Sequence, residues 1–143
     1  MLTSINISHV WVLDQDEALD FYVGKLGLEK RQDMNLGFMR WLTVGVPGDL
    51  GREILLEVPT APSVDEAAAQ QIRQLVSKGA TGFTVGFTTD NCRKTYEALL
   101  AKGIEFTQEP VTREYGTDIG IRDPFGNHIR VTELAPGVMG KMP

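Results

Sequence analysis

Two histidines and one strand glutamate are the side chains best suited to catalysis in this chain. His9 lies in an alternating segment that Asp14 ends, and Glu57 lies near the end of a later apolar segment. A histidine near neutral pH can carry a proton or bind a metal ion, and a glutamate can do both as well. We therefore take His9, Glu57 and His128 as candidates for acid–base or metal chemistry. Alternatively, His9 is a hydrogen-bonded pocket residue and Glu57 is the ion-pair partner of an arginine.

A second group of polar residues lies on the stretch from Gly116 to Glu133, which the alternation of apolar and polar residues predicts to be a β-hairpin. The segment Asp123 to Asn127 predicts its turn, because aspartate accepts backbone hydrogen bonds, proline fixes φ and glycine adopts positive φ. Such a polar face is either simply solvated or part of a binding site. It carries Asp118, Arg122, His128, Arg130 and Thr132.

Aromatic and loop residues extend the list of candidates. Trp11 and Trp41 could form the wall of a site for a flat or hydrophobic ligand, or could fill ordinary core. Arg113 and Tyr115 are expected in a loop before the last hairpin, where they could cover a ligand. Cys92 is expected at a helix start, and we interpret it as structural because no histidine is near it in the sequence.

The bulk composition limits the classes of function. The chain has 143 residues and is 42% hydrophobic, which suits one globular domain. A net charge of −5 disfavours a general binder of nucleic acid or of membrane surfaces. One cysteine allows no internal disulfide, and no apolar run is long enough for a membrane span. The first residues lack the pattern of a signal peptide, so we expect a cytoplasmic location.

The elements that position these residues follow from local patterns. Residues 5–12 predict a strand, and residues 15–25 predict an amphipathic helix that Asp14 or Asp16 caps and Gly27 ends. Residues 37–44 and 52–58 predict antiparallel strands. The segment Ser63-Val64-Asp65-Glu66 has the pattern of a capping box, which predicts a helix over residues 67–78.

The second half of the chain repeats the first. Residues 83–89 predict a strand, Asp90-Asn91 a cap, residues 92–102 a helix and residues 104–106 a further extended segment. Asp14 and Asp90 are 76 residues apart, as are Gly27 and Gly103. Such a period indicates an internal repeat of two units that must bury a core together. We expect one domain over residues 1–134, with module one at 4–60, a connecting helix at 63–78, module two at 82–133 and a loose tail at 135–143.

This order of elements and three motifs resemble the vicinal oxygen chelate superfamily, which includes glyoxalase I, extradiol dioxygenases, fosfomycin-resistance enzymes, methylmalonyl-CoA epimerase and bleomycin-binding proteins. The resemblance covers residues 5–133. It implies an α+β fold in which two βαβββ modules pair into a cup-shaped mixed sheet that holds the ligand, and it implies a homodimer. The motifs are Asp14, Asp20, Phe21, Tyr22, Leu26 and Gly27 in the first module, Lys102 to Phe106, and Asp123 to Asn127.

The resemblance also implies a divalent metal held by His or Glu at four strand positions. In this chain those positions are occupied by Ile7, with His9 two residues later, by Glu57, by Thr84 or its neighbour Phe83, and by Arg130. A fixed cation at a ligand position repels a divalent ion. We therefore expect no metal cofactor, although a divalent ion held by His9 and Glu57 stays possible. Glu57 is instead expected to pair with Arg130, because the guanidinium fork fits a carboxylate.

Two functions fit these residues. The first is a small-molecule binding protein of the bleomycin-resistance kind that works without the four-ligand metal site. The second is a metal-dependent lyase, isomerase or dioxygenase with an atypical ligand set, and metal-free acid–base chemistry by His9 or His128 is a third possibility. Expected partners are a small-molecule ligand and a second copy of the chain, with no nucleic acid and no membrane. The expected ligand-binding residues are His9, Trp11, Trp41, Glu57, Thr84, Arg113, Tyr115, His128 and Arg130.

Overall fold

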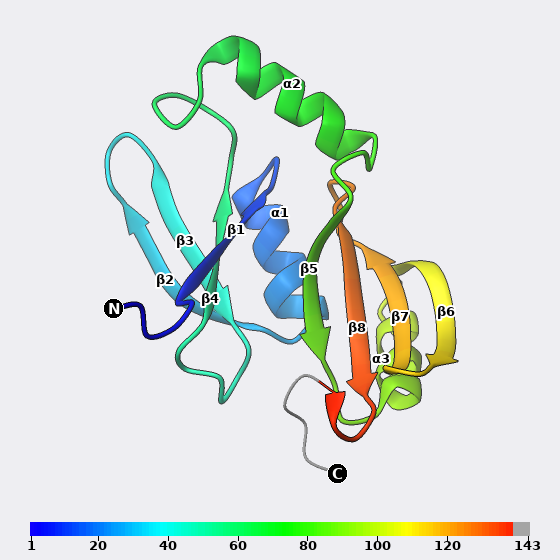
Figure 1. The fold of residues 1–143 in the computed structure, drawn as a ribbon. Helices are drawn as coiled ribbons and strands as arrows, with labels where there is room; N and C mark the ends of the chain where they lie inside the picture. Colours follow the sequence, from blue (N-terminus) through cyan, green and yellow to red (C-terminus); the bar gives the residue numbers. More distant parts are fainter. Residues whose placement is uncertain (139–143) are drawn as a thin grey trace. The chain divides into compact units, whose positions relative to one another are not determined.

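The chain folds into two compact units, each built on a four-stranded mixed sheet (Figure 1). The computed structural model describes residues 1–138. Unit 1 spans Met1–Ala80, and unit 2 begins at Thr81. They correspond to the two predicted modules, with the predicted connecting helix belonging to unit 1.

In unit 1 the strand order is β1-β4-β3-β2, with β1 parallel to β4 and the other pairs antiparallel. His9 lies opposite Leu55, and Trp11 lies opposite Glu57. The elements are β1 (Ile7–Trp11), α1 (Gln15–Leu19), η1 (Asp20–Lys25), β2 (Glu29–Asn35), β3 (Arg40–Gly45), β4 (Glu53–Glu57) and α2 (Glu66–Ser77).

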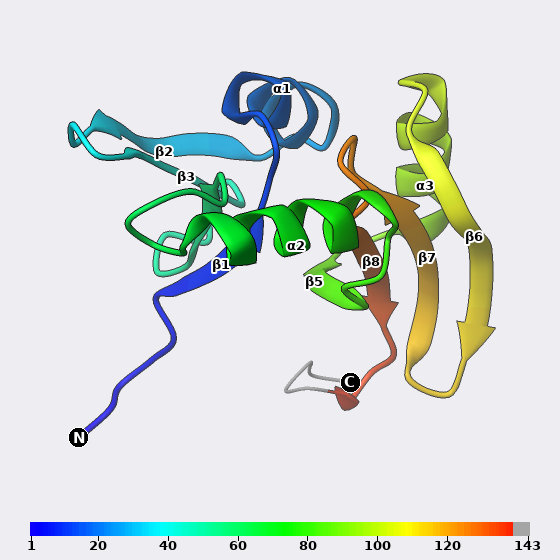
Figure 2. The same cartoon turned by 90° about the horizontal axis from the view of Figure 1, so that it is seen from above.

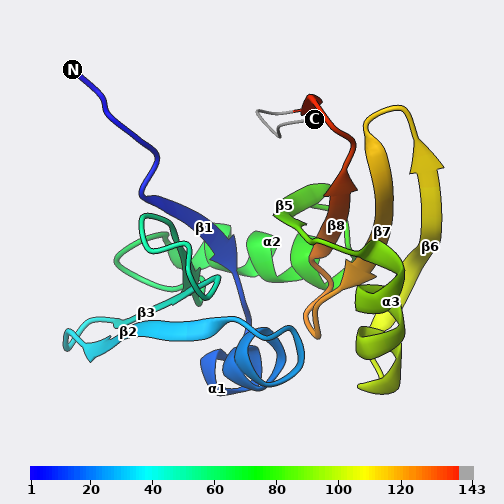
Figure 3. The ribbon, with the colours of Figure 1, turned by 90° about the horizontal axis from the view of Figure 1, so that it is seen from below.

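Unit 2 has the same topology, β5-β8-β7-β6, with β5 parallel to β8 and the other pairs antiparallel. Figure 3 shows β8 between β5 and β7. The predicted internal repeat is therefore confirmed, since both sheets place their first and fourth strands side by side. The elements are β5 (Phe83–Thr88), α3 (Cys92–Ala101), β6 (Glu105–Arg113), β7 (Gly116–Arg122) and β8 (His128–Leu134).

The first predicted helix is correctly placed but changes its winding midway. Asp14 is its cap and accepts a 2.8 Å hydrogen bond from the backbone N–H of Glu17. From Asp20 to Lys25 the winding is that of a π-helix, which the spacing of apolar residues did not predict. The consecutive residues Phe21 and Tyr22 are both buried there, and the wider turn brings both to the covered side.

The predicted capping box at the start of the second helix is wrong in its residues. Asp65 caps α2 by accepting from the backbone N–H of Ala68 at 2.7 Å, and the helix begins at Glu66. An ionised carboxylate at this end is favoured by the partial positive charge of the helix N-terminus. Ser63 is left free for another role, and its hydroxyl donates a hydrogen bond to Glu57.

Each sheet has one apolar face and one polar face. In unit 1 the apolar face carries Val10, Leu42, Val44 and Leu56, all at most 2% exposed, and α1 contacts β4. In unit 2 the apolar face carries Ile119, Ile121, Ile129 and Val131, and α3 runs beside β6 and β7 (Figure 2). We call the opposite face the polar face. By strand register it carries His9, Trp11, Trp41, Thr43 and Glu57 in unit 1, and Gly86, Asp118, Gly120, His128, Arg130 and Thr132 in unit 2.

The segment with Arg113 and Tyr115 is not the open loop that the sequence predicted. Arg113 ends β6 and Gly116 begins β7, so these residues form the tight turn of a hairpin. After β8, the backbone N–H of Ala135 donates to the carbonyl of Tyr115 at 2.8 Å, and residues 135–138 form a turn. The rest of the predicted tail, residues 139–143, lies outside the described residues. Within residues 1–138, none of the helices has the length and apolarity needed to cross a bilayer.

The predicted turn between β7 and β8 is confirmed, and Asp123 organises it. One carboxylate oxygen of Asp123 accepts from the backbone N–H groups of Phe125, Gly126 and Asn127 at 2.9, 3.0 and 2.9 Å. The other oxygen accepts from the side-chain amide of Asn127 at 2.7 Å. Because Asp123 is only 5% exposed, little water is available there to replace it as the hydrogen-bond acceptor.

Replacing Asp123 with alanine is expected to lower the free energy of unfolding by about 2–4 kcal/mol, because several buried donors lose their acceptor. Urea denaturation followed by circular dichroism measures the change. Asp90→Ala is the matched control, since Asp90 is exposed and Asn91 is the residue that caps α3. Equal effects of the two substitutions would contradict the role assigned to Asp123.

Candidate functional site

The polar face of unit 1 brings together four of the predicted residues. The Nε2 atom of His9 lies 2.7 Å from an oxygen of Glu57, and the hydroxyl of Ser63 donates to the other oxygen at 2.5 Å. The rings of His9 and Trp11 meet edge-on with centroids 4.3 Å apart. Trp41 lies on the same face by strand register. The histidine, the carboxylate and the two tryptophans thus share one surface.

The carboxylate of Glu57 orients the imidazole of His9. An ionised carboxylate only accepts hydrogen bonds, so Nε2 of His9 is the donor in this pair. The second ring nitrogen, Nδ1, then remains to exchange a proton or to bind a polar group of a ligand. The His9 side chain is 37% exposed, whereas that of Glu57 is 11% exposed. The carboxylate acts as a buried anchor, and the imidazole is the group that a ligand can reach.

The polar face of unit 2 is organised around Asp118, which is 1% exposed. Its carboxylate accepts from the hydroxyl of Tyr115 at 2.6 Å, from Nη2 of Arg130 at 2.5 Å and from the amide of Gln108 at 2.9 Å. Nη2 of Arg130 also donates to the amide oxygen of Gln108 at 3.0 Å. Arg113 contributes a longer contact, with its Nε 3.9 Å from Asp118. We call these five residues the Asp118 cluster.

The electrostatics of the Asp118 cluster favour an ionised carboxylate. Burial acts to raise the pKa of Asp118, but the hydrogen bonds from Tyr115, Arg130 and Gln108 outweigh it and leave the pKa below its usual value. The hydrogen bond to Asp118 raises the pKa of Tyr115, so this phenol stays a donor. Two arginines and one aspartate leave the cluster with one net positive charge.

Thr84, Phe83 and Cys92 lie outside the Asp118 cluster. Thr84 falls in a bulge of β5, and its hydroxyl donates to the carbonyl of Gly82 at 3.4 Å. Phe83 lies opposite His128 in the strand register and is 63% exposed. Cys92 is fully buried, which raises the pKa of its thiol and agrees with a structural role.

Sequence reasoning missed the central role of Asp118 and the contribution of Gln108. Asp118 was recognised as a polar-face residue, but its alternation with isoleucines gave no sign that the side chain would be buried. Gln108 lies between two register shifts of β6, so no simple alternation could place it. The only indication of this cluster in the sequence was the high number of polar residues on the predicted hairpin.

The residues at the four metal positions do not fit the ligand set that the resemblance implies. His9 and Glu57 are held by each other, and Arg130 is a cation tied to Asp118. Ile7 and Phe83 offer no ligand atom, and the hydroxyl of Thr84 donates to the carbonyl of Gly82. Among residues 1–138 no group of three or more His, Cys, Asp or Glu side chains is arranged to hold a metal ion. Two protein ligands rarely hold a catalytic ion, since structural and catalytic sites use three or four.

Glu57 and Arg130 each have partners within their own unit. Glu57 is engaged by His9 and Ser63, and Arg130 is engaged by Asp118 and Gln108. The expected ion pair between Glu57 and Arg130 is therefore not needed to satisfy the hydrogen bonding of either side chain. Arg130 pairs with Asp118 because this carboxylate lies on the same face of the neighbouring strand β7, within reach of the guanidinium.

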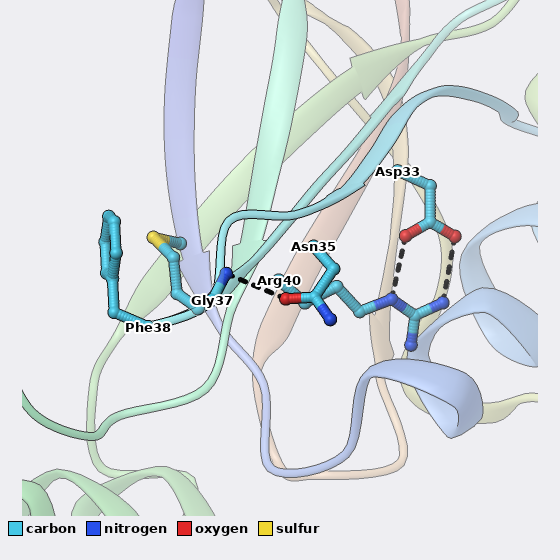
Figure 4. A pocket seen from close by; sticks show the side chains of 6 residues that line it. Asp33, Asn35, Gly37, Phe38 and Arg40 are labelled. Atoms are coloured by element: carbon cyan, nitrogen blue, oxygen red, sulfur yellow. Dashed lines mark hydrogen bonds and ion pairs between the residues drawn. The ribbon is translucent and has the colours of Figure 1, made fainter.

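A separate hollow of about 570 Å³ lies at the tip of the β2–β3 hairpin (Figure 4). Arg40 donates two parallel hydrogen bonds to Asp33 at 2.8 and 2.9 Å, and a third to Asp16 at 2.8 Å. The bonds from Arg40 lower the pKa of Asp33 to about 2. Because Asp16 belongs to α1, this ion pair network ties the hairpin to the helix on the apolar side of the sheet. Phe38 lines the hollow as well.

Comparisons with known proteins agree with the topology. The model of the Glyoxalase/Bleomycin resistance protein/Dioxygenase superfamily matches residues 4–131. The uncharacterized protein YurT of Bacillus subtilis (strain 168) is 35% identical over 130 residues, which cover 90% of this chain and 98% of YurT.

Two crystal structures illustrate the range of similarity. That of UcmS2 shares 38% identity with a TM-score of 0.88, covering 93% of this chain and 99% of UcmS2. That of TnmS3, an antibiotic binding protein from Streptomyces sp. CB03234, shares 23% identity with a TM-score of 0.74, covering 94% and 98% of the two chains. The second likeness concerns the fold alone.

Replacing Asp118 with asparagine is expected to lower the free energy of unfolding at pH 7 by about 2–3 kcal/mol, because Arg130 and Tyr115 lose a charged acceptor. The folded-state pKa of Asp118 lies below the unfolded value of about 3.9. Its stabilisation is therefore present above that pH and is lost as the pH falls through the folded pKa. Urea denaturation at pH 7, 5 and 3 should show the gap between wild type and variant closing toward pH 3.

Asp90→Asn serves as the control for this pH series, because Asp90 is exposed in the same unit. Its stability should follow that of the wild type at every pH. A gap for Asp118→Asn that stays constant down to pH 3 would show that the charge of Asp118 contributes nothing to folding.

Proposed function

Since the chain belongs to the glyoxalase/bleomycin resistance protein/dioxygenase superfamily, we propose that it is a small-molecule binding protein that needs no divalent metal. The ligand binds on the polar face of a sheet. The observation that carries the proposal is Arg130, a cation held by Asp118 at a position where the family resemblance implies a metal-binding carboxylate. A metal ion there would have to overcome the repulsion of a fixed positive charge.

The two polar clusters suit binding because their geometry is set before a ligand arrives. In unit 1 the imidazole of His9 is oriented by Glu57, and in unit 2 the guanidinium of Arg130 is oriented by Asp118. Side chains that are already ordered lose little conformational entropy when they bind. Trp11 and Trp41 add aromatic surface beside His9, which suits a ligand with flat or apolar parts.

A protein of the same fold gives a precedent. TnmS3 is an antibiotic binding protein, although its 23% identity with this chain extends to the fold alone. An antibiotic is therefore a reasonable first class of ligand to test. The expected homodimer and cytoplasmic location stay predictions.

The test is isothermal titration with metal-free bleomycin, doxorubicin, actinomycin D and novobiocin in buffer containing EDTA. At least one of these compounds is expected to bind with a Kd of about micromolar strength. Replacing EDTA with zinc or nickel should leave that Kd unchanged. Trp41→Ala or Glu57→Gln should weaken binding, whereas Glu109→Gln, at an exposed position of β6, is the control that should not.

Absence of binding by every compound, or binding that appears only after a divalent metal is added, contradicts the proposal. The second outcome would favour an enzyme with an unusual ligand set built on His9 and Glu57.

A proton-transfer enzyme is the second candidate, and the His9–Glu57 pair is the observation that favours it. A carboxylate that orients an imidazole leaves the other ring nitrogen available as a general base or acid. This chemistry needs no metal. Ser63 would then act only by holding Glu57 in place.

The enzyme alternative can be checked with the hemithioacetal of methylglyoxal and glutathione as substrate. With EDTA, nickel, zinc or manganese present, we expect no turnover above the uncatalysed rate, because the residues at the four metal positions do not form a ligand set. Turnover that disappears in His9→Gln and Glu57→Gln but persists in Glu109→Gln would instead establish catalysis at this pair.

A further inference from the structure

We propose that Arg130 binds an acidic oxygen of an aromatic ligand and that Phe83 forms the wall beside which the ligand's ring lies. This inference rests on the proposed binding function and names the class of ligand, an aromatic carboxylate or a ligand with an equivalent acidic group. It concerns only the polar face of unit 2.

Arg130 is flanked on both neighbouring strands by residues without side chains. Gly86 of β5 and Gly120 of β7 lie opposite Arg130 in the strand register. A Cβ at Gly120 would lie 2.5 Å from the hydroxyl of Thr107 and 3.6 Å from Nη1 of Arg130, so the guanidinium lies directly over this backbone. The missing side chains at Gly86 and Gly120 therefore let the Phe83 ring and the Arg130 guanidinium lie close to the sheet.

The guanidinium keeps donors available for a ligand. Both recorded bonds of Arg130 come from Nη2, one to Asp118 and one to Gln108. Within residues 1–138, no hydrogen bond from its Nε or Nη1 is recorded, and the side chain is 34% exposed. Nη1 can thus donate a charge-assisted hydrogen bond to an incoming oxygen while Asp118 keeps the arginine in place.

The charge of the surroundings favours an anion. Arg113 and Arg130 both approach Asp118 and Gln108, so one negative charge is shared by two positive ones. Because Asp118 is buried and fully engaged, it cannot turn outward to compete for the ligand. A ligand with an acidic oxygen would neutralise the remaining charge, whereas a cationic ligand would meet repulsion.

Phe83 supplies the apolar part of this subsite. A Cβ at Gly86 would lie 3.1 Å from the Phe83 ring, so the ring lies over Gly86, the residue opposite Arg130 in the strand register. Phe83 is 63% exposed, which is high for a phenylalanine on a strand. An exposed ring over the strand neighbour of an oriented arginine matches a ligand that carries its acidic group directly on an aromatic body.

The experiment compares three probes of equal shape, 2-naphthoate, 2-naphthamide and 2-naphthylmethylammonium, by titration followed with ¹H–¹⁵N NMR. We expect 2-naphthoate to bind about tenfold or more tightly than 2-naphthamide, the usual loss when a charge-assisted hydrogen bond is removed. The ammonium probe should bind more weakly still. During the titration with 2-naphthoate, the Nε–H signal of Arg130 and the amide signals of Gly86 and Gly120 should shift.

Two variants separate the parts of the subsite. Arg130→Lys keeps the charge but loses the planar fork. It should therefore lower the affinity for 2-naphthoate several-fold and leave the affinity for 2-naphthamide nearly unchanged. Phe83→Ala should weaken both probes alike. Arg122→Lys is the control, since Arg122 of β7 lies on the same face of the sheet as Arg130 but contacts Glu105. Should Arg130→Lys not fold, the comparison of the three probes on the wild type decides alone.

Equal affinities for the three probes, a preference for the ammonium probe, or binding that leaves the Arg130 signal unmoved each overturn the inference. Absence of binding by all three overturns it as well. In these cases, an antibiotic that still binds in the earlier titrations leaves the proposed binding function intact. Failure in both sets of titrations removes both proposals.

Discussion

The polar face of unit 2 depends on a single buried carboxylate. An ionised aspartate out of contact with water is stable only if its oxygens receive hydrogen bonds and its charge is neutralised. Asp118 meets both needs by drawing in Arg130 from β8, Gln108 from β6 and Tyr115 from the turn between β6 and β7. Three segments are thus held in fixed positions by one charge. The orientation of Arg130, on which its proposed role in ligand recognition rests, is a consequence of this requirement.

Unit 1 satisfies its buried carboxylate in a different way, although the two units share their topology. Glu57 accepts from the imidazole of His9 and the hydroxyl of Ser63, and neither partner has a fixed charge. The polar face of unit 1 thus carries an imidazole oriented by a carboxylate, whereas the Asp118 cluster holds a permanent cation. The repeat has therefore preserved the strands while giving each polar face a distinct chemistry.

Local patterns in the sequence were sufficient to predict the helices and strands and the residues on each face of the strands. The turn at Asp123, the caps Asp14 and Asn91, and the shared face of His9 and Glu57 all follow from short-range rules. The partners of the charged groups did not follow, because they depend on side chains that meet across strands. Bulges at Thr84 and near Gln108 shift the strand register by one residue. The sequence pattern predicted that Ser63 caps α2, but its hydroxyl donates to Glu57 instead. Such competition between local and long-range hydrogen bonds cannot be decided from spacing alone.

The pairing of Arg130 with Asp118 also restricts how this chain could change its chemistry over generations. A glutamate at position 130, as the resemblance implies for metal-binding relatives, would place a second carboxylate beside the buried Asp118, with only the more distant Arg113 left as a cation. Like charges at that distance destabilise each other strongly, so the single exchange would damage the fold before any metal could bind. Asp118 would have to change first or at the same time, since the two positions are energetically coupled. The salt bridge between Arg130 and Asp118 thus disfavours any single exchange that would place a carboxylate at position 130.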